Sequence, residues 1–144
     1  RIITCDLFEQ GNVSIDGVTN GYHGLSHHGQ DEENIRQLKI IETSILSELQ
    51  RFLAKLQATA EPDGSNLLDR TTVVLVSNLG NASNHSSQNL PAVVFGGGFQ
   101  HGRHLNFQPA NETPLCNLYL TVLQSMGVPV DSFSTSTGVL KALV

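Results

Sequence analysis

The 144-residue sequence contains only two cysteines, Cys5 and Cys116, and no cluster of lysines and arginines. Two cysteines so far apart lack the spacing of a zinc ribbon and are too few for a disulfide framework. We therefore expect two buried free thiols, with a Cys5–Cys116 bridge as the alternative. Eight basic against thirteen acidic residues give a formal net charge of −5, which argues against nucleic acid as a partner. No apolar run approaches the ~20 residues that a membrane span requires.

Several motifs are also missing. The chain has no His-Glu-x-x-His zinc motif, no Gly-x-Ser-x-Gly elbow for a serine nucleophile and no phosphate-binding glycine loop. The three glycines at 96–98 fit no phosphate-loop pattern, so we expect them to form a turn that needs positive φ. Residues 1–8 are rich in β-formers and predict a short strand rather than a leader peptide, which fits either a cytosolic protein or a mature or truncated chain whose leader was removed.

The apolar and polar residues that are present predict a soluble globular chain with two main helices. Apolar residues recur every three or four positions between Ile35 and Leu56, which predicts an amphipathic helix over residues 31–58. A second helix is predicted to start with Thr113 as N-cap and Pro114 at the first position, and to end before Gly127. Its predicted buried stripe consists of Leu115, Leu118, Val122, Leu123 and Met126.

Continuous β-branched runs, "TTVVLVS" at 71–77 and "PAVVFGGG" at 91–98, are typical of strands buried on both faces of a sheet. We expect 72–77 and 92–95 to be neighbouring central strands, with a further short strand at 103–107. Strands alternating with helices predict an α/β fold: a largely parallel sheet flanked by helices, in a single domain over residues 1–144.

Histidines carry the clearest chemical signal. Three of the six, His23, His27 and His28, lie in the glycine-rich stretch "GYHGLSHHG", and His85 lies in a long polar loop after Ser77. In a parallel sheet both segments reach the carboxyl edge, where ligands bind, so we expect His85 to approach the first cluster. Two interpretations stay open: these four histidines bind zinc or another divalent metal, or they are solvated loop residues.

Arg103 and His104, with His101 beside them, form a second candidate. An arginine fork between imidazoles suits an anion such as phosphate, sulfate or carboxylate, and a solvated turn is the alternative. Ser26 adjoins His27, but adjacent residues rarely point at each other, so a nucleophile–base pair is not expected here.

In order along the chain, "GYHGLSHHG", "LLDRTTVVLVSNLGNASNHSSQNLPAVVFGGG", "GRHL", "TPLCNLYLTVLQSMGV" and "DSFSTSTGVL" resemble the carboxyl-terminal part of a large bacterial family of unknown function. Its members are usually exported, and that family is similar to the alkaline phosphatase and sulfatase superfamily. The resemblance implies an alkaline-phosphatase-like fold, an exported (periplasmic or extracellular) location, and a chain that is a fragment of a longer protein.

The superfamily binds two divalent metals at the ends of central strands. By resemblance, His23 and His27 correspond to its Asp-x-x-x-His pair and His85 to a later ligand. Asn78 and Leu79 occupy the positions of its Asp-His pair, and the region that supplies its nucleophile lies outside this chain.

Two functions follow as alternatives. The chain is either the metal-site half of a phosphate- or sulfate-ester hydrolase, inactive without the missing amino-terminal region of the same protein, or a non-catalytic extracellular binding or scaffold module with a degenerate metal site. The first implies a small anionic ester as substrate.

Overall fold

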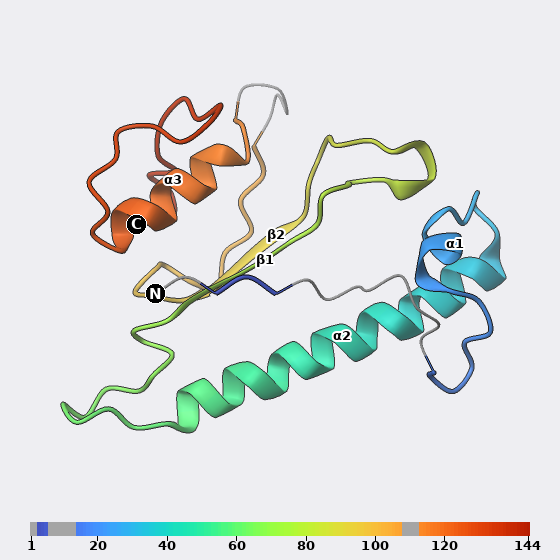
Figure 1. The fold of residues 1–144 in the computed structure, drawn as a ribbon, viewed down its shortest axis with the longest axis horizontal. Coiled ribbons are helices and arrows are strands. Elements are labelled where there is room, and N and C mark those ends of the chain that lie inside the picture. The colour runs from blue at the N-terminus through green and yellow to red at the C-terminus, as the bar shows by residue number, and fades with distance from the viewer. Residues whose placement is uncertain (1–2, 6–13, 108–112) are drawn as a thin grey trace. The chain divides into compact units, whose positions relative to one another are not determined.

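A computed structural model describes residues 3–5, 14–107 and 113–144. These residues fall into two compact units. The first unit comprises the chain up to Lys55 together with Asn81–Ser86, and the second comprises Leu56–Gly80 and Ser87–Val144. The described residues contain three α-helices, two strands and one 3₁₀ helix (Figure 1).

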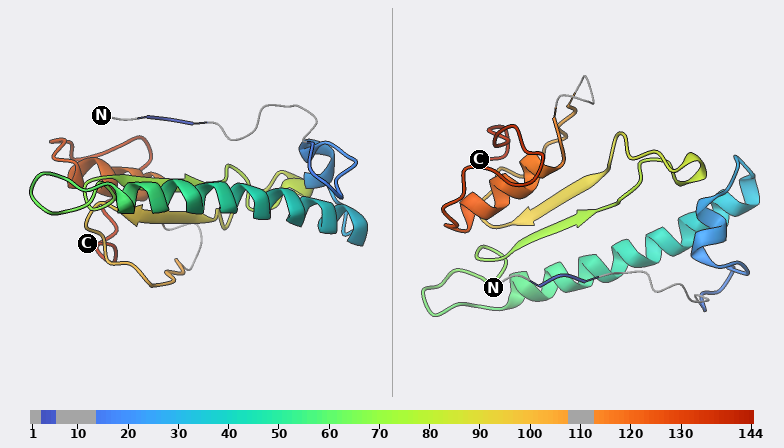
Figure 2. Two further views of the ribbon diagram at one scale, coloured as in Figure 1. Left: turned by 90° about the horizontal axis from the view of Figure 1, so that it is seen from below. Right: turned by 45° about the horizontal axis from the view of Figure 1, so that its top comes forward.

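The long helix α2, Glu32–Ala58, confirms the helix predicted over 31–58 and runs without interruption in both views of Figure 2. Its start is capped by Asp31, whose side chain accepts a hydrogen bond from the Asn34 N–H at 2.8 Å. This bond satisfies one of the backbone donors that a helix leaves without an intrahelical partner at its first turn. Ile41, 1% exposed, lies at the centre of its buried face.

A short helix that the sequence did not predict, α1 (Tyr22–Ser26), precedes α2 and lies beside its first turns (Figure 1). Three glycines close to it argued against regular structure, and five residues are too few for a helix to be stable alone in water. Tertiary contacts hold it instead, because the Leu25 side chain is 0% exposed.

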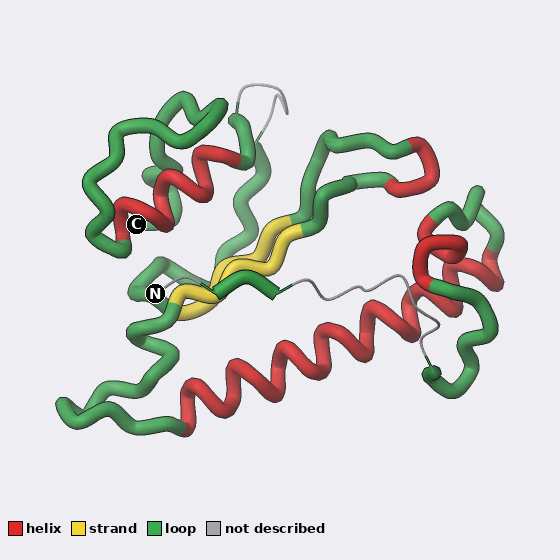
Figure 3. Tube along the Cα trace, viewed as in Figure 1, coloured by secondary structure: helices red, strands yellow, loops and turns green. Residues whose placement is uncertain are grey.

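The two strands, β1 (Thr72–Val76) and β2 (Ala92–Gly96), belong to the second unit and lie side by side (Figure 3). They pair antiparallel, with Thr72 opposite Gly96 and Val76 opposite Ala92. The prediction of a largely parallel, alkaline-phosphatase-like sheet flanked by helices is therefore wrong: the described residues form a two-stranded antiparallel sheet and three helices.

The reason lies in the connection between the strands. A parallel pair needs a crossover, usually an α-helix, whereas residues 77–91 contain only a three-residue 3₁₀ helix and return directly. Ser77 N–H donates to the Pro91 carbonyl at 3.2 Å and extends the hairpin past the strands. The two strands are neighbours as predicted, but they are not buried on both faces: Val76 and Val93 are 36% and 44% exposed.

Helix α3, Cys116–Ser125, begins two positions after Pro114, and the N-cap is Leu115 rather than Thr113. Its end is as predicted: Gly127 has φ of 77° and the Val128 N–H returns to the Leu123 carbonyl at 3.0 Å. The predicted stripe is only partly right. Leu118 is buried, but Met126 is 43% exposed, and the other buried residues of the helix are Asn117, Leu120 and Thr121.

The carboxyl-terminal segment folds around α3 (Figure 1). The Thr137 N–H donates to Asn117 Oδ1 at 2.7 Å, and Asn117 Nδ2 donates to Thr137 Oγ1 at 3.1 Å. The Leu140 N–H donates to Thr121 Oγ1 at 2.8 Å. Side-chain hydrogen bonds from one face of α3 thus fix a segment that has no regular secondary structure.

Some local predictions hold and others do not. Residues 96–98 have φ between 64° and 77°, and a Cβ on Gly96 would lie 2.2 Å from the Thr71 carbonyl oxygen, so the expected glycine turn is confirmed. Residues 103–107 are not a strand, nor are residues 3–5; the rest of the predicted first strand lies outside the described residues. Neither cysteine forms a disulfide bond, but Cys5 is exposed and Cys116 is half-buried, so the prediction of two buried thiols is wrong about their burial.

Candidate functional site: a histidine pair

The tip of the β1–β2 connection, Asn81–Ser86, belongs to the first unit and presents His85. Its centre is the 3₁₀ helix η1 (Ala82–Asn84), drawn as the helical turn in that connection in Figure 3. Asn81 and Ser86 exchange backbone hydrogen bonds of 3.4 and 2.9 Å, which close the turn. His85 ends it in the left-handed region at φ 53°, a conformation that costs a non-glycine residue about 1–3 kcal/mol and is frequent at functional sites.

His27 reaches the same place from the end of α1. Its Nε2 lies 3.2 Å from Nε2 of His85, and the two rings meet edge to face with centroids 4.8 Å apart. Beside them the Gly29 N–H donates to Ser83 Oγ at 3.4 Å. The predicted approach of His85 to the first cluster is confirmed for His27, although the predicted reason, the edge of a parallel sheet, is wrong.

A separation of 3.2 Å between two ring nitrogens suits two chemical states. In the first, one neutral imidazole donates its Nε2–H to the bare Nε2 of the other. In the second, both nitrogens are bare and point at one cation. Tetrahedral zinc with bonds of about 2.0–2.1 Å places two nitrogen ligands about 3.3 Å apart, so the pair is already at chelating distance.

The other two predicted ligands are placed differently. His23 is exposed, and its ring centroid lies 5.0 Å from that of His27. His28 uses its Nδ1 to accept the Gln30 N–H at 3.1 Å within a tight turn. In the described part of the chain, no three or more histidine, cysteine, aspartate or glutamate side chains are placed together as a metal site. The structure thus brings together one pair, His27 and His85, with His23 adjacent.

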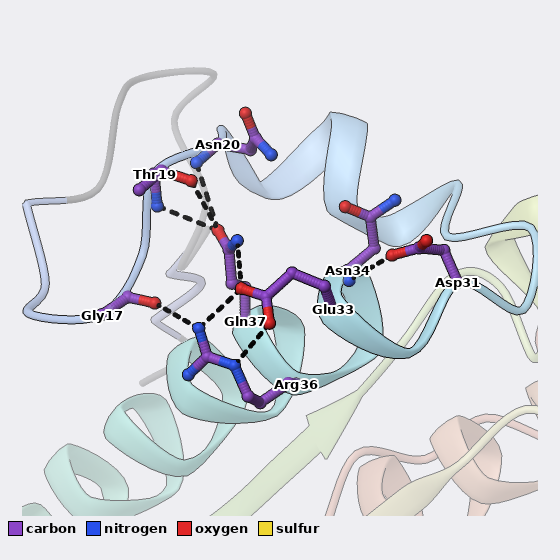
Figure 4. Close-up of polar contacts among 8 residues, drawn as sticks. All are labelled: Gly17, Thr19, Asn20, Asp31, Glu33, Asn34, Arg36 and Gln37. Carbon is purple, nitrogen blue, oxygen red and sulfur yellow. Dashed lines mark hydrogen bonds and ion pairs between the residues drawn. The ribbon is translucent and has the colours of Figure 1, made fainter.

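A buried amide that the sequence reasoning missed lies behind α1. Gln37 is 4% exposed; its Oε1 accepts the Thr19 N–H at 2.9 Å and the Asn20 N–H at 3.3 Å (Figure 4). Its Nε2 donates to Glu33 Oε1 at 2.8 Å. The available signal was its position, one turn before the core residue Ile41, because a polar side chain on a buried helix face needs partners.

Glu33 is in turn held by Arg36. The Arg36 guanidinium donates from Nε to Glu33 Oε2 at 2.8 Å and from Nη2 to Glu33 Oε1 at 2.6 Å. The same Nη2 also donates to the Gly17 carbonyl at 3.2 Å. These bonds from Arg36, with a smaller contribution from Gln37, lower the pKa of Glu33 from 4.5 to about 2. The loop before α1 is therefore tied to the first turns of α2 by both charged and neutral groups.

Two side chains of the predicted anion site, Arg103 and His101, lie at hydrogen-bonding distance from backbone carbonyls. Arg103 donates to the carbonyl of Ala142, His101 Nε2 lies 3.1 Å from the Gly96 carbonyl oxygen, and His104 is exposed. His101 also lines an open depression of about 440 Å³ beside the glycine turn, together with Asp69 and Phe99. Anion binding by Arg103 and His104 stays a prediction.

The remaining candidates have local partners. The Ser26 hydroxyl donates to the His23 carbonyl at 2.8 Å. Asn78 is exposed, and the Leu79 backbone exchanges hydrogen bonds with the Ser77 hydroxyl. At the start of α3, hydrogen bonds to the Cys116 thiol, first from the Thr135 hydroxyl and then from its N–H, lower the pKa of Cys116 below 9.0.

Comparisons with known proteins identify no matching family model, no similar curated protein and no similar solved structure. The family resemblance of the sequence motifs therefore stays a prediction. Of the helices in the described residues, none is both long enough and apolar enough to cross a membrane.

Proposed function

We propose that this chain is a metal-binding module that holds a divalent ion of the zinc type between His27 and His85, and that it is not catalytic by itself. The observation that supports the proposal is the 3.2 Å separation of the two Nε2 atoms, which belong to segments fifty-eight residues apart. Imidazole is the commonest metal ligand in proteins, and neutral Nε2 is one of its two coordinating atoms.

Two nitrogens do not complete a zinc site, because zinc is usually coordinated by four ligands. His23 is the proposed third ligand, because its ring is exposed and already lies beside His27. A change of rotamer at an exposed side chain is rapid and meets little steric resistance. Water or a ligand from a partner takes the fourth position. His28 is left out because its Nδ1 already closes the turn with Gln30.

The ion holds the tip of the β1–β2 connection against the end of α1. Ordering the tip Asn81–Ser86 against the end of α1 costs conformational entropy, and a metal that binds only the folded arrangement offsets that cost. An open coordination position on the ion also suits an anionic group, including a phosphate or sulfate ester. The proposed partner of the chain is an amino-terminal region of the same protein. In this proposal, that region supplies the nucleophile that hydrolyses the ester.

Titration calorimetry with zinc tests the proposal. We expect the wild-type chain to bind one zinc ion. We expect no heat of binding from His27→Ala or from His85→Ala, and an affinity for zinc about tenfold lower in His23→Ala. His104→Ala is the matched control, since it removes an exposed histidine outside the cluster. Absence of binding by the wild-type chain, or binding that survives both His27→Ala and His85→Ala, overturns the proposal.

A further inference from the structure

We propose that Gln37 is the positioning residue of the histidine pair: its side-chain amide sets where α1 begins and thereby where the His27 ring lies. The inference rests on the proposed function only in treating His27 as a metal ligand. The positioning itself is a property of the metal-free chain and can be measured without any ion.

The contacts of Gln37 explain why it has this influence. Its single Oε1 accepts three hydrogen bonds, from the Thr19 N–H at 2.9 Å, the Thr19 hydroxyl at 3.3 Å and the Asn20 N–H at 3.3 Å. Its Nε2 donates to Glu33 (Figure 4). With 4% of its surface exposed, Gln37 has little water to replace these partners.

The loop that Gln37 holds leads directly to the ligand. Asn20 is followed by Gly21, the N-cap of α1, which has no side chain to cap the helix. Gln37 therefore fixes the entry to α1, and Leu25, 0% exposed, fixes its middle. His27 is the C-cap of the same helix. A five-residue helix has too few internal hydrogen bonds to keep its place once one of these two anchors is lost.

The side chain at position 37 must accept from the loop and also share a hydrogen bond with position 33, which the Gln37 amide does by accepting and donating at once. Gln37→Ala leaves three donors without their acceptor and removes one hydrogen bond from the Glu33 carboxylate, which Arg36 still holds. Gln37→Glu keeps the acceptor but sets a carboxylate against Glu33 and removes the donor. Adding Glu33→Gln to Gln37→Glu reverses the direction of that hydrogen bond: the amide now at position 33 donates to the carboxylate at position 37, which still accepts from the loop.

The first measurement is made on the metal-free chain by NMR. In the wild type, Nε2 atoms 3.2 Å apart bring the His27 and His85 ring protons close enough for a nuclear Overhauser effect. The effect is expected to disappear in Gln37→Ala and in Gln37→Glu, and to return in the double variant Gln37→Glu/Glu33→Gln. The matched control is Gln50→Ala, an exposed glutamine of the same helix, which is expected to keep the signal.

The second measurement uses Cu²⁺ as the probe and counts coordinated nitrogens by electron paramagnetic resonance. The wild type, Gln50→Ala and the double variant are expected to show the three nitrogens of His23, His27 and His85. Gln37→Ala is expected to show fewer, with an affinity for Cu²⁺ about tenfold lower. A signal without two nitrogens in the wild type contradicts the proposed function alone. A ring–ring Overhauser effect that persists in Gln37→Ala, or that the double variant fails to restore, overturns the positioning role.

Discussion

The two units of the chain use the same device for different ends. Each contains one buried side-chain amide, Gln37 in the first and Asn117 in the second, 4% and 6% exposed. Each amide binds an adjoining irregular segment through its oxygen and also donates through its nitrogen. In both units, a helix thereby orders a stretch of chain that has little secondary structure of its own.

The difference lies in what the ordered segment carries. Gln37 orders the loop that leads into α1, and His27 caps the end of that helix with its Nε2 3.2 Å from that of His85. Asn117 orders the segment that brings Ser134 and Thr135 to the single sulfur of Cys116. The first arrangement brings two ring nitrogens close together, whereas the second places hydrogen-bond donors around one sulfur atom. Only the first is an arrangement that suits the proposed metal ion.

Truncation of one core leucine in each unit gives the largest expected effect. Leu25→Ala and Leu120→Ala remove side chains that are 0% and 1% exposed, so each is expected to lower the free energy of unfolding by about 2–5 kcal/mol. Chemical denaturation measures both losses. Zinc titration under native conditions then separates the variants: Leu25→Ala is expected to lose binding and Leu120→Ala to keep it. Equal zinc affinity in the two variants would remove the distinction between the units.

Loss of the second amide has the next largest effect. Asn117→Ala is expected to cost about 1–3 kcal/mol of unfolding free energy, because the Thr137 N–H loses its acceptor. It also releases the donors that surround the thiol, so the pKa of Cys116 is expected to rise toward 9.0. The rate of alkylation at pH 7.5 reports the thiolate fraction and should fall. Gln37→Ala should leave the alkylation rate unchanged. A slower rate in Gln37→Ala would contradict the claim that the two amides act separately.

The acid dependence of stability compares one carboxylate from each unit. Arg36 and Gln37 lower the pKa of Glu33 from 4.5 to about 2, and Ser65, chiefly through its hydroxyl, lowers that of Asp63 from 3.8 to about 2. A lowered folded-state pKa means that the stabilisation is present above the ordinary value and is lost as the pH falls toward 2. Melting temperature should therefore drop between pH 5 and 2, with a smaller drop in Glu33→Gln and in Asp63→Asn. A pH profile unchanged in both variants would refute this assignment.

The smallest expected signal is in catalysis. The chain alone is expected to hydrolyse phosphate or sulfate esters no faster than buffer with the same zinc, since Ser26 donates to a backbone carbonyl and lacks an activating base. A chromogenic ester assay measures this. Hydrolysis that co-purifies with the protein and disappears in His85→Ala would show instead that the pair is catalytic.

How much the sequence predicted depended on the range of the interactions involved. Helix α2 and the end of α3 were predictable because apolar periodicity and Gly127 act locally. The pairing of β1 with β2 was predictable as proximity but not as direction, because a continuous apolar run has no polarity of its own. Helix α1 was missed because its stability comes from the burial of Leu25, which depends on tertiary packing rather than on local propensity.

The histidine site was predictable in part. Clustering of His23, His27 and His28 marked the first segment, and a long polar loop marked His85, so a meeting of the two was expected. Which histidine meets His85 depends on the C-cap conformation of α1 and on the left-handed φ of His85, neither of which follows from composition. Gln37 escaped notice because a single amide on a helix face has many solvated counterparts, such as Gln50 on the same helix.

Zinc K-edge X-ray absorption of the chain loaded with one equivalent of zinc tests the central claim, that His27 and His85 chelate one ion. We expect at least two imidazole nitrogens at about 2.0–2.1 Å from the metal in the wild type, and their loss in His85→Ala, where zinc binding is expected to be abolished. The distance of 3.2 Å between the Nε2 atoms leaves both within reach of a single ion. Two results would contradict the claim: a zinc shell made up of oxygen alone in the wild type, or a spectrum that is identical in the wild type and in His85→Ala.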